Sequence, residues 1–374
     1  MTTKKTKYRV AQVGCGNRGL THLSGWAANP DDFEVVALCE LDESRMLSAK
    51  EKYRLNCPLY SDVDTMLRDV SPDIFCFATM PDMRLSLVEK AAIHKVPAIC
   101  FEKPMALSLN EASKILKTCQ DSGIKATICH QQLFISSFRK LNQILNNGEI
   151  GRVSEIHSTS TGNLFDRGTH YTHYLLWASG FAKPRWVIGH IHGRKELEDT
   201  HPSPDFCMYR LELDEGITGL GEFGALAPRY DSGDLWQVNR LTVHGSNGKV
   251  WAETTGLWGA VSVQSNPSVR RGQNDGYLKT DPAAGWEWEV DKIQSAYAKS
   301  ISDWLNGIIP DHPCSIEHAY TGFEVLSAAC YSSLENVRVD LPLSDPDALT
   351  NEGKDIFVRL HDELPECIQI KDVI

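Results

Sequence analysis

The chain has 374 residues, of which 42% are hydrophobic and 23% charged, and its formal net charge is -11. This composition is ordinary for a folded protein with room for two domains, and it excludes fibrous and disordered classes. The negative charge argues against nucleic acid and anionic membrane surfaces as main partners, because both would be repelled.

The first residues of the chain and its cysteines indicate the cellular compartment in which the protein is expected. The first seven residues are polar and lead directly into a strand-like run, so no apolar leader is expected. No apolar run is long enough to span a bilayer. The 11 cysteines contain no C-x-x-C pair, and several lie inside strand-like runs, as expected of small buried side chains in a reducing compartment. The sequence therefore predicts a cytoplasmic protein.

The first third of the sequence alternates short β-branched runs with helical patterns. Strands are expected near 8–13, 34–39, 73–78, 97–101 and 125–129. Helices are expected near 18–28, 43–53, 61–69, 84–95 and 108–121. Such alternation predicts an α/β domain built on a doubly wound parallel sheet, which we place at residues 1–130.

The pattern changes after about residue 130. A helix is expected over 136–146, followed by strands near 153–161, 185–192, 206–213, 217–223, 238–244 and 249–252. The turns at 214–216 and 246–248 favour antiparallel pairing. Residues 258–290 have no clear period and are expected to form a long loop. With helices at 291–306 and 315–335, residues 131–374 are predicted to be an α+β domain with a large, mostly antiparallel open sheet.

The first predicted strand runs into a glycine loop that opens a helix. The loop consists of Gly14, Cys15, Gly16, Asn17, Arg18 and Gly19. In a dinucleotide-binding fingerprint the first glycine makes the tight turn, the second lets the backbone approach the pyrophosphate, and the third allows close helix packing. The helix N-terminus attracts the phosphate charge. We therefore expect this loop to bind a dinucleotide.

The second predicted strand ends at an acid, Glu40, which lies 21 residues after Gly19. A carboxylate at this place accepts hydrogen bonds from the ribose hydroxyls and repels a 2′-phosphate. The sequence therefore favours NAD over NADP as cofactor. The plain alternative is a glycine turn followed by a solvated glutamate.

The fifth predicted strand ends in Glu102-Lys103-Pro104. The carboxyl ends of strands line the ligand crevice of open α/β sheets, so Lys103 would lie beside the cofactor. Its amine can donate a hydrogen bond to a reacting oxygen, and Pro104 can follow a cis bond. The alternative is a solvated lysine at a strand end.

A second constellation joins Asp166, His170 and His173 ahead of an apolar run. A helix that begins near Gly168 would place the two histidines on one side, with Asp166 at or before the first turn. An aspartate beside a histidine orients the imidazole, as a general base for an alcohol proton requires. The alternative is that Asp166 caps the helix and His170 is a satisfied core residue.

Other histidines and the tryptophans leave further alternatives. His190 and His192 would share one face of a strand, and with the 166–173 group they invite a metal hypothesis. Nothing in the sequence brings the two groups together, so no metal is assigned. Six tryptophans form either core or a sugar-stacking wall, namely Trp186, Trp236, Trp251, Trp258, Trp286 and Trp288.

Taken in order, these motifs resemble the glucose–fructose oxidoreductase / inositol dehydrogenase / rhizopine-catabolism (Gfo/Idh/MocA) family over nearly the whole chain. The glycine loop, Glu40, Glu102-Lys103-Pro104 and the D-x-x-x-H pair carry the resemblance, together with the turn at 148–153. It implies a Rossmann domain, catalytic roles for Lys103 and His170, and a supporting role for Asp166. The chain departs from it at His173, often an aspartate in relatives, and at Glu40, more often an aspartate.

The motifs and the resemblance together predict an NAD-dependent oxidoreductase that acts on a secondary hydroxyl of a sugar, sugar derivative or cyclitol. The cofactor-binding residues would be the glycine loop with Glu40, Glu102 and Lys103. The resemblance also implies a homo-oligomer, a dimer or tetramer formed through the second domain. Two alternatives stay open: a lyase or glycosidase that oxidises its substrate transiently with tightly held NAD, and a non-catalytic dinucleotide-dependent sensor.

Overall fold

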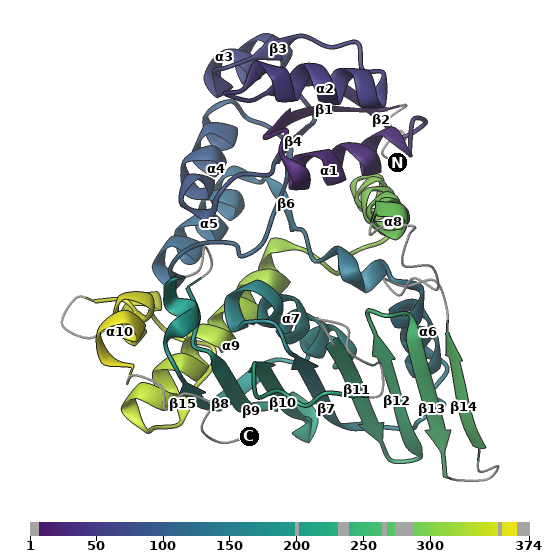
Figure 1. Cartoon of the computed structure of the whole chain (residues 1–374), viewed down its shortest axis with the longest axis vertical. Coiled ribbons are helices and arrows are strands. Elements are labelled where there is room, and N and C mark those ends of the chain that lie inside the picture. Colours follow the sequence, from purple (N-terminus) through teal and green to yellow (C-terminus); the bar gives the residue numbers. More distant parts are fainter. Residues whose placement is uncertain are drawn as a thin grey trace. The chain divides into compact units, whose positions relative to one another are not determined.

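The structure is a computed structural model that describes residues 7–198, 202–230, 239–263, 268–273, 287–350 and 354–364. The chain forms two compact units (Figure 1). Unit 1 is made of Met1–Leu107, Glu111–Phe134 and Asp281–Ala319. Unit 2 is made of Ser108–Asn110, Ile135–Thr280 and Tyr320–Ile374. None of the helices within the described ranges has the length and apolarity needed to cross a membrane.

Unit 1 is built on a six-stranded sheet in the order β3-β2-β1-β4-β5-β6, and every strand pair in it is parallel. Its strands are β1 (Tyr8–Val13), β2 (Phe33–Cys39), β3 (Leu59–Tyr60), β4 (Ile74–Phe77), β5 (Ala98–Phe101) and β6 (Lys125–Ile128). The strand order reverses between β1 and β4, and such a switch point opens a ligand crevice at the carboxyl ends of the strands. The predicted doubly wound parallel sheet is confirmed, with the short β3 added.

Helices cover the sheet of unit 1. They are α1 (Asn17–Ala27), α2 (Glu43–Tyr53), α3 (Val63–Val70), α4 (Arg84–Ile93), α5 (Leu109–Ser122) and α8 (Glu287–Leu305). Strands β4 and β5 are buried at every position, as expected of parallel strands with both faces covered. The rings of Phe77 and Phe101 stack across these two strands at 4.8 Å.

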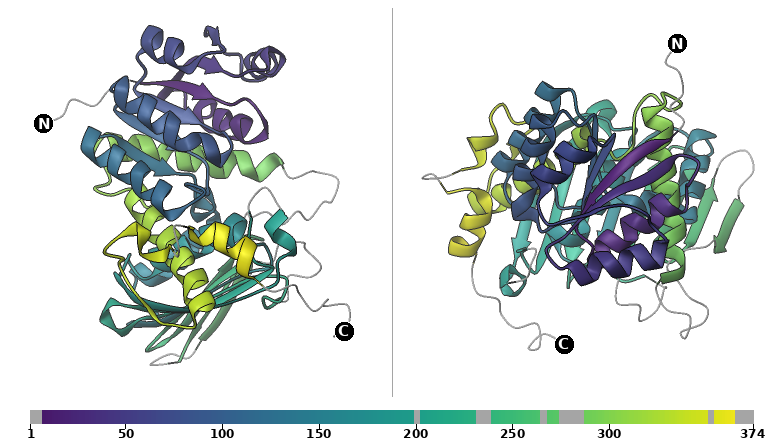
Figure 2. Two further views of the ribbon diagram at one scale, coloured as in Figure 1. Left: turned by 90° about the vertical axis from the view of Figure 1, so that its left-hand side faces the viewer. Right: turned by 90° about the horizontal axis from the view of Figure 1, so that it is seen from above.

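Helix α8 comes from the second half of the sequence and packs against α1 in unit 1 (Figures 1 and 2). Gly25 of α1 makes the close approach possible, because a Cβ there would lie 2.8 Å from the carbonyl oxygen of Gln294. Asn29 at the end of α1 donates a hydrogen bond of 3.0 Å to the carbonyl oxygen of Ser295. Residues far apart in the sequence therefore share one core.

Unit 2 is built on a nine-stranded sheet in the order β14-β13-β12-β11-β7-β10-β9-β8-β15. Its strands are β7 (Val153–Ser160), β8 (Pro184–His192), β9 (Phe206–Leu213), β10 (Thr218–Gly224), β11 (Asn239–Gly245), β12 (Gly248–Glu253), β13 (Leu257–Ser262), β14 (Ser268–Gln273) and β15 (Val339–Asp340). Strands β7 and β10 are parallel, while the other pairs are antiparallel. The predicted mostly antiparallel open sheet is confirmed.

One face of this sheet carries the helices of unit 2 (Figures 1 and 2). They are α6 (Ser136–Asn146), α7 (Thr169–Ala178), α9 (Ile316–Glu335), which begins in unit 1, and α10 (Ile356–Glu363). No helix in the described ranges lies on the opposite face, where Ile188 and Met208 are exposed. The turns predicted at 214–216 and 246–248 do join neighbouring antiparallel strands.

The long loop expected over 258–290 is wrong for the described part of that range, which contains most of β13, all of β14 and the start of α8. Glycines in these strands interrupt the alternation of apolar and polar side chains by which a strand is predicted. Gly259 of β13 is an example, because a Cβ there would lie 2.6 Å from the indole of Trp251 on the neighbouring strand. The indole occupies the space that a side chain at position 259 would need. Residues 264–267 and 274–286 lie outside the described ranges.

Candidate functional site

The loop after β1 has backbone geometry that only glycine tolerates. Gly14 has φ +87°, and a Cβ there would lie 2.5 Å from the carbonyl oxygen of Ala78. A Cβ on Gly19 would lie 2.0 Å from the carbonyl oxygen of Gly14. The first turn of α1 therefore sits directly against the turn that leaves β1.

Gln12 of β1 stabilises this turn, although no motif in the sequence includes it. The residue is fully buried, and its Nε2 donates hydrogen bonds to the carbonyl oxygens of Gly14, at 3.2 Å, and Gly19, at 2.8 Å. Its amide thus ties both ends of the loop together. This bond fixes the shape of the loop and leaves the Gly16 side of the backbone for a ligand.

A hollow of about 380 Å³ opens at the start of α1. It is lined by Cys15, Gly16, Asn17, Leu20, Ser44, Arg45 and Ser48. Helix α1 follows Gly16 and has no side-chain cap, and a Cβ on Gly16 would meet its first neighbour only at 3.8 Å. The N-terminus of a helix favours a phosphate group, and here the backbone is open to one.

Glu40 follows β2 and closes over the loop. Its carboxylate accepts backbone hydrogen bonds from Cys15 at 3.0 Å, Leu41 at 2.8 Å and Asp42 at 3.4 Å. Burial raises the pKa of this carboxyl, but the backbone donors outweigh burial and the net pKa is lowered. Glu40 is therefore an anion fixed beside the glycine loop, where the ribose of a dinucleotide is expected.

Arg45 brings a positive charge to the same place. Its guanidinium is largely exposed and lies 3.4 Å from the carboxylate of Asp42. A nearby arginine can accommodate the 2′-phosphate of NADP. The hollow is therefore lined by a cation, Arg45, and an anion, Glu40, is hydrogen-bonded to the lining residue Cys15 beside it. The motifs of the sequence indicated only the anion.

Lys103 follows β5, and its side chain is buried with 6% exposed. The bond between Lys103 and Pro104 is cis. Glu102 beside it is also buried, and its carboxylate accepts a hydrogen bond of 3.2 Å from Nε2 of His22. Burial raises the pKa of the Glu102 carboxyl. The bond from His22 and the charges of Arg18 and Lys103 lower this pKa by more than burial raises it, to about 2. The solvated lysine of the alternative hypothesis is wrong.

Two residues that the sequence analysis missed support this turn. Arg84 of α4 is buried, and its Nη2 donates to the carbonyl oxygens of Thr79 and Lys103, both at 3.2 Å. Burial lowers the pKa of Arg84 to about 10, against the raising effect of Glu102. The other residue, His22 on α1, is fully buried. Neither lies in a motif, so only the tertiary structure reveals them.

In unit 2 the Asp166 region begins with a π-helical turn, Leu164–Gly168, followed by α7. Asn163 caps this turn, because its side chain accepts a hydrogen bond of 2.7 Å from the backbone N–H of Asp166. The alternative placed a cap at Asp166, whereas the cap of this turn is Asn163. The Asp166 carboxylate is partly exposed and lies 3.3 Å from Nε of Arg167.

His170 lies in the first turn of α7 with 1% of its surface exposed. Its Nδ1 is 3.1 Å from the hydroxyl of Tyr174, one turn further along the helix. His173 is fully buried in the same helix. The tyrosine contact fixes the orientation of the His170 ring, which is one requirement for a positioned base.

The two histidine groups of the metal hypothesis are not brought together as a cluster. His190 and His192 share a face of β8, as predicted. Among the described residues, the two groups of three or more potential metal ligands both contain His22. Its partners are Cys76, Cys100, Glu102 and Cys129, all in the core of unit 1.

Comparison with known proteins finds a family match for the first part of the chain. Residues 8–130 match the model of the oxidoreductase family with an NAD-binding Rossmann fold, GFO_IDH_MocA. D-apiose dehydrogenase of Paraburkholderia graminis is 32% identical over 150 residues, which are 40% of this chain and 39% of that enzyme. The chain spans about two fifths of the length of the first curated relatives it matches.

Two longer matches extend beyond the first unit. Myo-inositol 2-dehydrogenase of Thermotoga maritima is 22% identical over 267 residues, which are 66% of this chain and 75% of that enzyme. The solved structure of levoglucosan dehydrogenase in complex with NADH and levoglucosan superposes with a TM-score of 0.75 at 16% identity. The superposition covers 90% of this chain and 100% of that one, so the fold of both units is shared.

The loop at 14–19, the parallel sheet beneath it and the match over residues 8–130 agree with one another. Residues 8–130 of this chain therefore match the NAD-binding Rossmann domain of the Gfo/Idh/MocA family of oxidoreductases.

Proposed function

We propose that this protein is an NAD-dependent oxidoreductase that transfers a hydride between the nicotinamide and a secondary hydroxyl of a sugar, sugar derivative or cyclitol. The glycine loop carries the proposal, because its backbone admits a phosphate and excludes side chains at Gly14 and Gly19. The named relatives, an apiose, an inositol and a levoglucosan dehydrogenase, support the substrate class.

The cofactor would lie along the residues of the loop. The backbone from Gly14 to Gly19 would hold the pyrophosphate at the N-terminus of α1, and Glu40 would accept hydrogen bonds from the adenosine ribose. Glu102 and Lys103 lie at the end of β5, on the edge of the sheet where ligands of this fold bind. When bound, NAD supplies the hydride acceptor, while the protein supplies position and charge.

Lys103 would bind the reacting oxygen of the substrate. Its ammonium can donate a hydrogen bond and stabilise negative charge that develops on that oxygen. Because the side chain is buried beside the Glu102 carboxylate, its charge is held in a site with little water. In the oxidative direction this interaction makes the hydroxyl proton easier to remove.

His170 would accept that proton, with Asp166 in a supporting role. The contact of His170 Nδ1 with Tyr174 holds the ring, so that a fixed nitrogen serves as the base. Asp166 would support the base through its negative charge, because a carboxylate near an imidazole stabilises the protonated ring. Its carboxylate is partly exposed and lies 3.3 Å from Nε of Arg167. These roles come from the resemblance and from the types of residue.

Substitution of the two proposed catalytic residues tests the assignment. Lys103→Ala and His170→Ala should each lower turnover by about 100-fold or more. NAD affinity should change little in His170→Ala, because that residue has no cofactor role. Steady-state NADH production across sugars, sugar acids and inositols measures turnover, and Lys195→Ala serves as a control outside the proposed site. Unchanged turnover in both variants would refute the assignment.

We propose NAD as the physiological cofactor because Glu40 is an anion fixed at the expected ribose position. Arg45 would favour NADP instead, since its guanidinium can pair with a 2′-phosphate. Titration of the protein with NAD and NADP should show tighter binding of NAD. In Arg45→Ala any residual NADP affinity should fall while NAD affinity is kept, and tighter binding of NADP by the wild type would contradict the proposal.

We also propose that the protein acts in the cytoplasm as a homo-oligomer. The helix-free face of the unit 2 sheet exposes Ile188 and Met208, which is a surface suited to self-association. Light scattering after size exclusion measures the oligomeric state, and a monomer at all concentrations would contradict the proposed homo-oligomer.

Tight NAD binding without NADH release on any substrate would favour the alternative of a lyase or glycosidase that oxidises its substrate transiently.

A further inference from the structure

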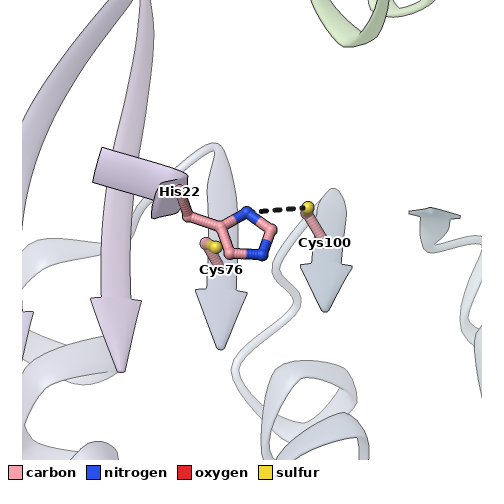
Figure 3. Close-up of side chains that lie close together, drawn as sticks. All are labelled: His22, Cys76 and Cys100. Atoms are coloured by element: carbon pink, nitrogen blue, oxygen red, sulfur yellow. Dashed lines mark hydrogen bonds between the residues drawn. The ribbon is translucent and has the colours of Figure 1, made fainter. Parts of the chain in front are cut away.

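The core of unit 1 contains a cluster of soft metal-ligand groups. His22 lies on α1, Cys76 on β4 and Cys100 on β5, and all three are fully buried. One ring nitrogen and the two sulfur atoms lie within 4.8 Å of one another. Figure 3 shows the imidazole between the two strands, with Nδ1 directed at the Cys100 sulfur.

The backbone brings the two sulfur atoms together. Cys76 and Cys100 are partners in register on neighbouring parallel strands, so their side chains leave the same face of the sheet. His22 approaches that face from α1, and its Nδ1 is 3.9 Å from the Cys100 sulfur. Two thiolates bound to one zinc ion at about 2.3 Å each, with an imidazole at about 2.0 Å, need ligand atoms in this range of separation.

The other ring nitrogen of His22 has the partner that metal-bound histidines usually have. Its Nε2 is 3.2 Å from the carboxylate of Glu102, which can only accept a hydrogen bond when ionised. The proton of a neutral ring is therefore placed on Nε2, and Nδ1 presents its lone pair toward the sulfur atoms. Such a carboxylate fixes the ring and increases its basicity as a ligand.

A second group of potential ligands adjoins the first, because His22 also lies within 4.8 Å of a carboxylate oxygen of Glu102 and the sulfur of Cys129. The two groups share only His22. The amide of Gln294 approaches Nδ1 at 3.2 Å, and this amide would have to turn aside when an ion binds. Thiol and imidazole donors select zinc or monovalent copper over magnesium and calcium.

We propose that His22, Cys76 and Cys100 bind a thiophilic metal ion, with Glu102 as the group that orients His22. Zinc is the ion to test. Binding transfers the protons of the ligating thiols to solvent and forms zinc–sulfur bonds, with no change of oxidation state. The ion would join the first helix to β4 and β5, so it would act on the stability of unit 1. The inference does not depend on the proposed dehydrogenase activity.

Because the ligands are fully buried, the ion would enter during folding. The full chain is therefore produced in medium supplied with zinc, desalted, and analysed by elemental mass spectrometry and by native mass spectrometry. We expect about one zinc ion per chain, as for a closed structural site. Zinc well below stoichiometry in the folded wild type would overturn the proposal.

Matched cysteine variants locate the ion. Cys76→Ser and Cys100→Ser should lose zinc, whereas Cys207→Ser, at an equally buried cysteine of unit 2, should keep it. Equal loss in Cys207→Ser would place the ion elsewhere and overturn the assignment. A Cys76–Cys100 disulfide found by peptide mapping of the unreduced wild type would overturn it too, since that bond consumes the ligands.

A measurement on the wild type avoids dependence on variants that fail to fold. Refolding with Co²⁺ in place of Zn²⁺ should give the near-ultraviolet absorption of sulfur-to-cobalt charge transfer, with an intensity typical of at least two thiolates. Cobalt bound without that band would show oxygen or nitrogen ligands only and would overturn the proposal. Chelation should lower the unfolding temperature of the zinc-loaded wild type and leave Cys100→Ser unchanged.

Discussion

Each unit contains a buried glutamate with a shifted pKa, and the two shifts have opposite directions. In unit 1, Glu102 is hydrogen-bonded to His22 and surrounded by positive side chains, and its pKa falls to about 2. In unit 2, Glu324 of α9 accepts one backbone hydrogen bond of 3.1 Å, from Leu343. Burial raises the pKa of Glu324 to about 7, and the bond from Leu343 opposes this only in part.

The difference shows what burial does when it is and is not compensated. Loss of water raises the pKa of any carboxyl group, and only nearby donors and cations reverse that effect. Unit 1 supplies a histidine together with Arg18 and Lys103, so its glutamate stays ionised at the edge of the sheet where a ligand is expected. Around Glu324, unit 2 supplies a single backbone amide, so this glutamate is partly neutral near pH 7.

The largest effect should come from removing the charge of Glu102. Glu102→Gln removes the negative charge that lies near the buried cation Lys103 and accepts the bond from His22, and removing one partner of a buried charge pair typically costs about 3–5 kcal/mol of the free energy of unfolding. Urea denaturation at neutral pH measures the change. A loss below about 1 kcal/mol would mean that the pair and its surroundings give no net stabilisation.

The reverse change in unit 2 should have the opposite sign. Glu324→Gln removes a group that resists ionisation, so the variant should be more stable than the wild type at about pH 8, by up to about 3 kcal/mol. The amide keeps an oxygen for the bond from Leu343. Equal stability of the two proteins at pH 8 would contradict the raised pKa.

The pH dependence of that difference follows from the direction of the shift. The folded pKa of Glu324, about 7, lies above the ordinary value of 4.5, so the folded state binds more protons between these two values. Its stabilising contribution is complete below pH 4.5 and is lost as the pH rises through 7. The difference in the free energy of unfolding between wild type and variant should therefore be constant at low pH and should change between about pH 5 and 8.

A neutral, half-buried cap should have a smaller effect than either glutamate. Asn163→Ala removes the side-chain oxygen that accepts the bond from the backbone of Asp166, and loss of such a cap costs about 1 kcal/mol. Thermal unfolding measures the change. Asn163→Asp keeps an acceptor at this place and should recover most of the loss, while an equal loss in both variants would mean that the cap does not hold the turn.

The smallest effect on stability is expected from a solvent-exposed ion pair. Lys117 and Asp121 lie 2.8 Å apart on α5, one helical turn apart, and both side chains are mostly exposed. Lys117→Ala should change the free energy of unfolding by at most about 0.5 kcal/mol, because solvent screens the pair. A loss near that of Glu102→Gln would contradict the view that burial sets the energy scale of these charges.

Local pattern was sufficient for much of unit 1. The strand at 8–13, the glycines at 14, 16 and 19 and the acid at 40 all follow one another along the chain, and their spacing predicts the parallel sheet that is observed. Alternating strands and helices are decided mainly by near neighbours in sequence. The catalytic roles of Lys103, His170 and Asp166 stay predictions.

The sequence failed where neighbours in space take over from neighbours in sequence. Strand β13 was expected to be loop, because its glycine leaves room for the indole of Trp251 from β12. Helix α8 was not expected to pack on α1, since no local pattern reports which distant helix will cover a given face. Asn163 was overlooked as a cap because the π-helical turn shifts the start of the helix.

The sequence by itself determined the order of elements, the fold class and the glycine loop, because periodicity and turn chemistry act over a few residues. Only the tertiary structure decided what surrounds each buried polar group. His22, Cys76, Cys100 and Glu102 lie in separate elements, and packing of α1 on β4 and β5 brings them into contact. The charge state of a buried group depends on such contacts, and motif spacing cannot report them.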